Sequence, residues 1–373
     1  MAKMENQAEP LPKRMPTLDG LRGVAALIVM FGHATAVIYQ DPAAPRKGLA
    51  VAFFFMLSGF VLAHAYQGKL THGLSLGGFL RVRAIRLYPM IIAASILSFV
   101  VRFLVDGRFH LNAAWLTATL AALLGLPSPP IPPNVYGYFP LNAPEWSLFY
   151  ELALSALFGI VLYRLKSRHI AVTASVALTG DIVLRAIYKI EADVLWTESF
   201  GAIAAFCIGV LLLRFAANDR VSRRSIPLIV LAVPIVAATF MPHSVGWWFD
   251  IAAVNVIFPA VILGGVYTRN TTSLPRILGG ISYPLYILHW PIMVACNNVL
   301  VPRIGSAMAL ASVCIFSIST SWLALKIFDE PVRAWLTRIN APIFGARSVL
   351  GVSGPPDGAA GSHRLRAAKI VRR

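Results

Sequence analysis

The sequence predicts an all-α polytopic membrane protein with about ten transmembrane helices. Of its 373 residues, 57% are hydrophobic and only 13% are charged, and the mean hydropathy is +0.70. Soluble domains carry about 25% charged residues, so this composition excludes an ordinary soluble domain. Apolar blocks follow one another from Leu21 to Phe328, which is far more than a signal peptide explains. No cleavable signal is predicted at the N-terminus.

Ten apolar blocks are predicted to cross the bilayer, although several are shorter than the roughly 20 residues of a perpendicular span. Their approximate bounds are 20–39, 49–66, 87–105, 145–164, 169–186, 199–215, 226–241, 249–267, 278–300 and 306–328. An eleventh apolar block, 111–126, lies between Asp106 and the Pro-rich run PSPPIPP.

The basic residues indicate how the chain is threaded, because Lys and Arg collect in cytoplasmic loops. If 111–126 does not cross, 26 of the 33 Lys and Arg residues lie on the same side as the N-terminus. Counting 111–126 as a span would move the basic run RLKSRH to the other side. We therefore expect both termini to be cytoplasmic and 111–144 to be an outer hairpin or a re-entrant element. The net charge of +17 then reflects topology, and no nucleic-acid partner is expected.

The predicted domain organisation is simple. Residues 15–333 form one membrane-embedded domain, without a linker to a second folded domain. Residues 1–14 and 334–373 are predicted to be disordered cytoplasmic tails. The second tail ends in a basic segment, which is either plainly solvated or bound to anionic lipid headgroups.

The first span carries ionisable groups on one face. Asp19 and Arg22 lie one helical turn apart at its start and form a charged pair, and His33 follows on the same stripe. The rise from Arg22 to His33 is about 16 Å on an ideal helix. Ionisable groups inside a membrane are costly and often functional. The alternative is a histidine whose hydrogen bonds are satisfied inside the bundle.

Three more polar residues fall within apolar blocks at mid to outer depth: Ser58, Glu151 and His289. An unsatisfied polar group there would cost several kcal/mol, so we expect these side chains and His33 to face one another or a wet cavity. Taken alone, Ser58 beside Gly59 suits helix packing, and His289 suits a structural role. Glu151 needs a partner or a proton.

A basic cluster precedes the third span, in RVRAIRLYP. Arg83 and Arg86 are three residues apart and so share a helix face at the predicted cytoplasmic edge. They are either positive-inside anchors or a phosphate clamp, since guanidinium groups bind phosphate bidentately. The motifs of common soluble enzymes are absent from the sequence. Basic groups inside and a buried imidazole further out would suit a long phosphorylated donor that enters from the cytoplasm.

Six motifs in order resemble the acyltransferase-3 family of bacterial integral-membrane O-acyltransferases. They are LDGLRGVAALIVMFGH, FFFMLSGFVL, RVRAIRLYP, EWSLFYEL, ISYPLYILHWP and FDEPVR, and they extend over about 15–333. The resemblance implies a multi-pass protein of the bacterial inner membrane. It implies transfer of an acyl group, usually acetyl, from cytoplasmic acyl-CoA to a sugar hydroxyl of a polysaccharide, lipopolysaccharide or other glycoconjugate. Many relatives add a soluble hydrolase-like domain, and no such domain is expected here.

The resemblance also implies roles for individual residues. The family's first-helix histidine falls on His33, and its arginine pair falls on Arg83 and Arg86, with Arg22 as a further donor-binding residue. The remaining motif positions fall on Asp19, Ser58, Trp146, Ser147, Glu151, Ser282, Tyr283 and His289.

The mechanism expected from this resemblance places acyl-CoA phosphates at the arginines and its pantetheine arm toward His33. His33 would act as a general base on the acceptor hydroxyl, or would itself carry the acyl group. Glu151 would orient an imidazole or bind sugar hydroxyls. No metal or bound cofactor is expected. A competing function is a proton-coupled transporter or flippase that uses the same histidine and glutamate as a relay.

Overall fold

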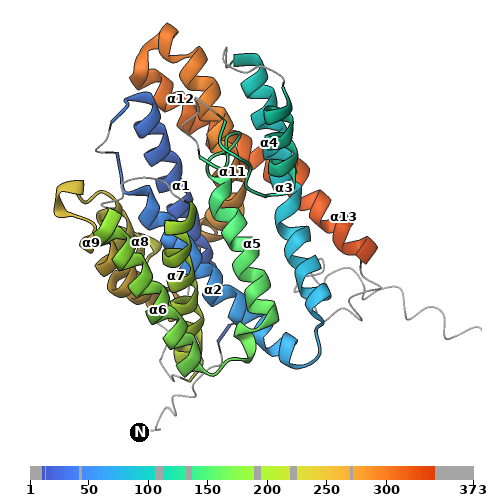
Figure 1. Ribbon diagram of the computed structural model, residues 1–373, viewed down its shortest axis with the longest axis vertical. Helices are drawn as coiled ribbons and strands as arrows, with labels where there is room; N and C mark the ends of the chain where they lie inside the picture. Colours follow the sequence, from blue (N-terminus) through green and yellow to red (C-terminus); the bar gives the residue numbers. More distant parts are fainter. Residues whose placement is uncertain are drawn as a thin grey trace, which may run out of the picture.

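The protein is a bundle of long helices, and no β-sheet occurs in the residues that the structure describes (Figure 1). The computed structural model describes residues 11–12, 14–41, 44–105, 112–131, 137–188, 195–218, 225–268 and 272–340. Its α-helices are α1 (Pro16–Ile38), α2 (Lys47–Thr71), α3 (Leu76–Val105), α4 (Ala113–Leu123), α5 (Glu145–Ile160), α6 (Ser167–Tyr188), α7 (Leu195–Asn218), α8 (Leu228–Thr239), α9 (Trp248–Ala252), α10 (Phe258–Val266), α11 (Leu274–Val299), α12 (Val301–Ala324) and α13 (Glu330–Asn340). The all-α prediction is confirmed.

Each of the ten predicted spans corresponds to a helix, but the helices differ in length. Within the described part of the chain, eight helical stretches are long and apolar enough to cross a membrane. The two remaining predicted spans are α5, with 16 residues, and α8, with 12 residues. These reach only about 24 and 18 Å, less than the roughly 30 Å of hydrocarbon. That both termini are cytoplasmic stays a prediction.

Helices α3 and α5 run antiparallel, which decides the path of the segment between them. Phe79, near the start of α3, packs against Gly159 near the end of α5. Ser95, two thirds along α3, donates a hydrogen bond to Glu145 at the start of α5 (3.2 Å). The end of α3 and the start of α5 therefore lie on the same side. This confirms that the block 111–126 does not add a crossing.

Helix α4, within that block, folds back along α3. Its far end lies halfway along α3, where the hydroxyl of Tyr88 donates to the carbonyl of Leu124 (3.1 Å). The chain then returns, and Pro140 lies beside Arg102 near the end of α3 (3.4 Å). Figure 1 shows α4 alongside the same half of α3. This path fits the predicted hairpin or re-entrant segment, and whether the segment enters the bilayer stays a prediction.

Helices α1 and α11 form the most extensive pair in the bundle and run parallel. Gly23 of α1 packs against Leu278 of α11, and ten residues later His33 contacts His289. Parallel packing is what the first and ninth of ten spans require. It brings the polar faces of the two helices together along their length.

Close backbone approach joins α2 to α7. A Cβ on Gly59 would lie 2.1 Å from the carbonyl oxygen of Phe206, and a Cβ on Gly209 would lie 2.0 Å from that of Met56. Small residues allow such contact between membrane helices. Gly59 therefore has the packing role that the sequence suggested for the Ser58–Gly59 pair.

We expect Gly59→Ala to destabilise the protein by roughly 1–3 kcal/mol, because α2 and α7 must move apart to admit the methyl group. Thermal unfolding of the purified protein in detergent measures the loss. The matched control is Gly68→Ala in the same helix, where nothing lies within 4 Å of the added carbon. Equal unfolding temperatures of the two variants would contradict the packing role.

At the C-terminal end, α12 continues through a π-helical turn, Leu325–Asp329, directly into α13. Residues 334–340, which the sequence assigns to the tail, are thus the last turns of a helix. Positions 1–10, 13 and 341–373 of the predicted tails lie outside the described residues.

Candidate active site

A cavity lies between α1, α2, α3, α5 and α11. Its lining contains most of the residues that the sequence singled out. They are Arg22, Ser58, Arg86, Ser147, Glu151, Ser282 and Tyr283, together with Val51, Phe54, Phe55, Leu87, Leu148 and Tyr286. One end is polar and the other apolar: along α2, Ser58 and Val51 are seven residues or about 10 Å apart. Ser58 thus faces the cavity beside the packed Gly59.

Glu151 pairs with Arg83 rather than with an imidazole. Its Oε1 accepts a hydrogen bond from Arg83 Nη2 at 2.6 Å, and the Arg83 side chain is only 7% exposed. A carboxylate inside a bundle is stabilised by a cation that is itself buried and bonded. Glu151 is therefore at the depth of Arg83, not at that of His33, which corrects the depth estimated from the sequence.

Arg83 and Arg86 do not form one clamp in this structure. A spacing of three residues turns their side chains about 60° apart on a helix. Arg83 faces the interior and Glu151, whereas Arg86 is exposed at the rim of the cavity. Of the two, only Arg86 lines the cavity.

The polar end of the cavity has an excess of positive charge. Arg22 lines it and lies within electrostatic reach of Arg83, Arg86, Glu151 and Asp19. Asp19 is exposed, and no direct ion pair joins it to Arg22 in the described part of the chain, so the two charged residues at the start of α1 interact only at longer range. Because Glu151 is committed to Arg83, the guanidinium groups of Arg22 and Arg86 remain for an anion.

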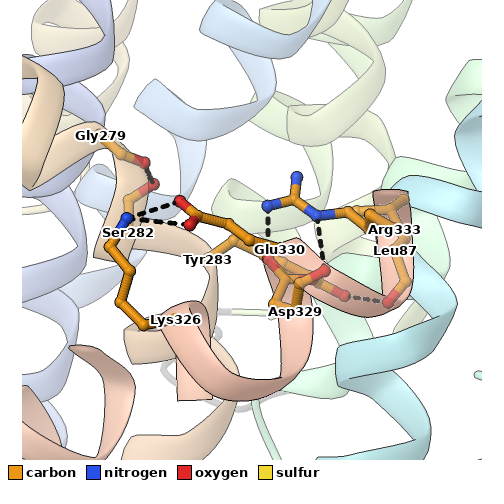
Figure 2. Close-up of polar contacts among 8 residues, drawn as sticks. All are labelled: Leu87, Gly279, Ser282, Tyr283, Lys326, Asp329, Glu330 and Arg333. Carbon is orange, nitrogen blue, oxygen red and sulfur yellow. Dashed lines mark hydrogen bonds and ion pairs between the residues drawn. The ribbon is translucent and has the colours of Figure 1, made fainter. Parts of the chain in front are cut away.

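The wall beside this end is held by side-chain to backbone bonds (Figure 2). Tyr283 donates from its hydroxyl to the carbonyl of Leu87 at 2.6 Å, which ties α11 to α3, and Ser282 donates to the carbonyl of Gly279. Asp329, of the FDEPVR motif, is buried and pairs with Arg333 at 2.7 Å. These contacts position the helices and leave Tyr283 and Ser282 little freedom to donate elsewhere.

Beyond the apolar end lie the two histidines of the parallel helix pair. His33 Nδ1 and His289 Nε2 are 3.0 Å apart, and the rings are stacked with centroids 5.2 Å apart. The ring of Trp290 lies nearly perpendicular to that of His33, with the centroids 5.4 Å apart. His289 is completely buried, while His33 is partly exposed. The prediction that these two polar groups face one another is confirmed.

The hydrogen bonds determine where the protons of this neutral pair lie. His289 Nδ1 contacts the carbonyl oxygen of Leu285 at 3.0 Å, and a carbonyl can only accept. His289 Nδ1 therefore carries the proton, and its Nε2 accepts. His33 must then donate from Nδ1, which leaves the lone pair of His33 on Nε2. No partner of that nitrogen occurs among the described residues, so it is available as a base.

Asn142 supports the histidine pair, and the sequence analysis missed it. Pro291 has no N–H, so the carbonyl of Ile287 lacks its helical donor. The side-chain amide of Asn142 donates to that carbonyl at 3.0 Å and is itself fully buried. The HWP motif signals a free carbonyl beside His289, but no local pattern identifies its partner 145 residues away.

Tyr286 is a second residue that the sequence analysis missed. Its hydroxyl lies 2.6 Å from Ser147 Oγ, and its ring centroid lies 6.1 Å from that of His289, with the planes at 69°. It therefore belongs both to the cavity and to the surroundings of the histidine pair. Trp146, next to Ser147, packs against Phe55 and Tyr150 and does not line the cavity.

Comparison with known protein families assigns the chain to one of them. The family model described as an acyltransferase domain, acyltransferase-3, matches residues 15–326. The chain belongs to this family. Protein 2 in the picA locus of Rhizobium radiobacter is 40% identical over 160 residues, which is 40% of this chain and 82% of that protein.

A second relative carries an activity in its name. The acyltransferase MdmB of Streptomyces mycarofaciens is 31% identical over 166 residues, which is 42% of this chain and 41% of that protein. No solved structure matches. Membership of the acyltransferase-3 family makes the protein a multi-pass membrane acyltransferase, and it favours acyl transfer over the alternative of a transporter or flippase.

Proposed function

We propose that the protein transfers an acyl group from cytoplasmic acyl-CoA to a hydroxyl group of a sugar in a cell-surface glycoconjugate, in the bacterial inner membrane. The observation that carries this proposal is a cavity lined at one end by Arg22 and Arg86, neither of which forms a direct ion pair among the described residues, with a histidine pair beyond the other end. Acyl transfer in general follows from the family. Acyl-CoA as the donor, a sugar hydroxyl as the acceptor and the bacterial inner membrane as the location are our proposal.

The donor would bind at the polar end. CoA carries phosphate groups, and guanidinium groups bind phosphate with charge-assisted hydrogen bonds. Arg22 and Arg86, which line the cavity, would make this contact, while Arg83 would act indirectly by holding Glu151. The pantetheine arm would then lie along α1 toward His33, over about 16 Å of helical rise.

At the far end, His33 would act as the general base. Its Nε2 takes the proton of the acceptor hydroxyl as the oxygen attacks the thioester carbonyl, and the thiolate of CoA leaves and receives a proton. His289 accepts from His33 Nδ1 and so favours the imidazolium that forms. If the donor thioester and the acceptor hydroxyl are both held beside His33, they react as neighbours and need not meet by diffusion.

The test is transfer of label from [14C]acetyl-CoA into glycoconjugate by membranes that contain the protein. We expect label in the glycan fraction that mild alkali releases, because an ester is cleaved there and an amide is not. Alkali-stable label would indicate transfer to an amine, and absence of label above membranes without the protein would overturn the proposal.

We expect Arg86→Ala to raise the KM for acetyl-CoA by about 10- to 100-fold, since hydrogen bonds to charged groups are worth about 1.5–3 kcal/mol. The effect should shrink at high salt because the rim is exposed. Arg81→Ala is the matched control: Arg81 is an exposed arginine of the same helix and does not line the cavity. Equal KM values for the two variants would exclude Arg86 from donor binding.

A further inference from the structure

Lys47, the first residue of α2, lies on the stripe of that helix that faces the cavity. Val51, Phe54, Phe55 and Ser58 line the cavity at helical spacing, and Lys47 occupies the next position of this stripe, four residues before Val51. It is therefore about 6 Å beyond Val51 along the helix. The histidine pair lies beyond the same end of the cavity, so α2 carries a lysine toward it.

Lys47 also packs against the helix that carries His33. A Cβ on Gly32, the chain neighbour of His33, would lie 3.2 Å from the Cβ of Lys47. The ammonium group is within electrostatic reach of the His33 ring. It forms no hydrogen bond or ion pair with any residue that the structure describes, and the side chain is partly buried. A cation without a counter-ion thus lies beside the proposed base.

The preceding residue fixes the start of α2. The guanidinium of Arg46 pairs with Asp250 at 2.6 Å and donates to three backbone carbonyls within 241–246, at 2.7–3.3 Å. The backbone N–H of Arg46 donates to the carbonyl of Thr239 at 2.8 Å, and Arg46 is only 6% exposed. Lys47 is therefore positioned before any substrate binds, and Asp250 is bonded to Arg46.

The charge of Lys47 bears on the proposed reaction. When His33 Nε2 takes a proton, an imidazolium forms next to the ammonium, and two like charges repel. The other titratable neighbour that acts on His33 among the described residues is His289, which supplies no negative charge. Acyl transfer itself supplies one, because negative charge develops on the carbonyl oxygen of the thioester. A fixed cation at that oxygen stabilises the transition state strongly where water is scarce.

We propose that Lys47 stabilises the oxyanion that forms when the acceptor hydroxyl attacks the thioester. The acceptor oxygen bonds to the carbonyl carbon as His33 Nε2 takes its proton, and the carbonyl electron pair moves onto the oxygen beside Lys47. The intermediate then reforms the carbonyl and breaks the C–S bond, and His33 returns the proton to the departing CoA thiolate. This inference rests on the proposed function and adds to it a partner for His33.

The test compares acetyl-CoA with dithioacetyl-CoA, in which sulfur replaces the carbonyl oxygen and accepts hydrogen bonds poorly. Release of the CoA thiol is measured in native membranes, above the level of the His33→Ala variant. We expect Lys47→Met to lower kcat for acetyl-CoA by about 10²–10³-fold with little change in KM, and to lower turnover of dithioacetyl-CoA much less. Lys47→Arg keeps the cation and should retain more activity than Lys47→Met.

Lys69→Met is the matched control, because Lys69 lies at the other end of α2 and does not line the cavity. It should leave the turnover of both thioesters nearly unchanged. If Lys47→Met does not accumulate in the membrane, Lys47→Gln replaces it, with the same expected loss of selectivity between the two thioesters.

The proposal is overturned if Lys47→Met keeps acetyl-CoA turnover within a few-fold of the unaltered protein. It is also overturned if both thioesters lose rate equally, which is the result of a structural defect. Loss of label transfer to the glycan with full release of CoA would place Lys47 at the acceptor and not at the oxyanion. An unaltered protein that releases no CoA above the His33→Ala level contradicts the proposed function itself.

Discussion

Replacement of His33 by Ala is expected to lower the rate of acyl transfer by roughly 10²–10⁴-fold, the range that a positioned general base contributes. The reason is specific to one atom: Nε2 of His33 is the free base of the pair, since Nδ1 is bonded to His289. Label transfer from acetyl-CoA, divided by the amount of inserted protein, measures the loss.

His64→Ala is the matched control for His33→Ala. His64 lies on α2, is bonded to the backbone of Pro12 and does not line the cavity, so its loss should leave transfer nearly unchanged. His289→Gln should retain more activity than His289→Ala, because an amide oxygen can still accept from His33. Transfer by His33→Ala within a few-fold of the unaltered protein would contradict the mechanism.

Replacement of Glu151 by Leu is expected to destabilise the protein by about 3 kcal/mol or more, because it leaves Arg83 buried without its partner. The Arg83 side chain is 7% exposed and that of Glu151 is 24% exposed, so the arginine bears most of the penalty. Unfolding temperature in detergent and the yield of inserted protein both report the change.

The double variant Arg83→Met with Glu151→Leu should recover most of that stability, since an apolar pair of similar volume often replaces a buried ion pair without loss. Acyl-CoA turnover in this variant then tests the catalytic role that the sequence assigned to Glu151. A double variant as unstable as Glu151→Leu alone would show that the ion pair is not the source of the effect.

The helices and their threading could be predicted because both signals are local. Apolar blocks predict spans, and the distribution of Lys and Arg predicts that 111–126 does not cross. The antiparallel contacts of α3 with α5 confirm this path. The lengths of the spans were less accurate: α3 begins at Leu76, eleven residues before the predicted span, so Arg83 lies within the helix and not at its mouth.

The error in the depth of Glu151 has the same origin. Depth was counted from the ends of apolar blocks, as if every helix were a full span in a common frame. Helix α5 has only 16 residues and α3 has 30, so equal counts from their ends do not correspond to equal depths. Tyr286 and Asn142 were missed for a different reason, since a tyrosine or asparagine near an apolar block carries no distinctive pattern.

By itself the sequence determined the class of protein, the approximate helices, the threading of 111–144 and the ionisable residues that need a partner. Only the tertiary structure decided the partners: His33 with His289, Glu151 with Arg83, and Tyr286 beside both the cavity and the histidines. Hydropathy and charge are properties of each segment, so the spans and their orientation can be predicted from one segment at a time. A buried polar group instead bonds to whichever helix packs beside it, and that neighbour is set by the packing of the whole bundle.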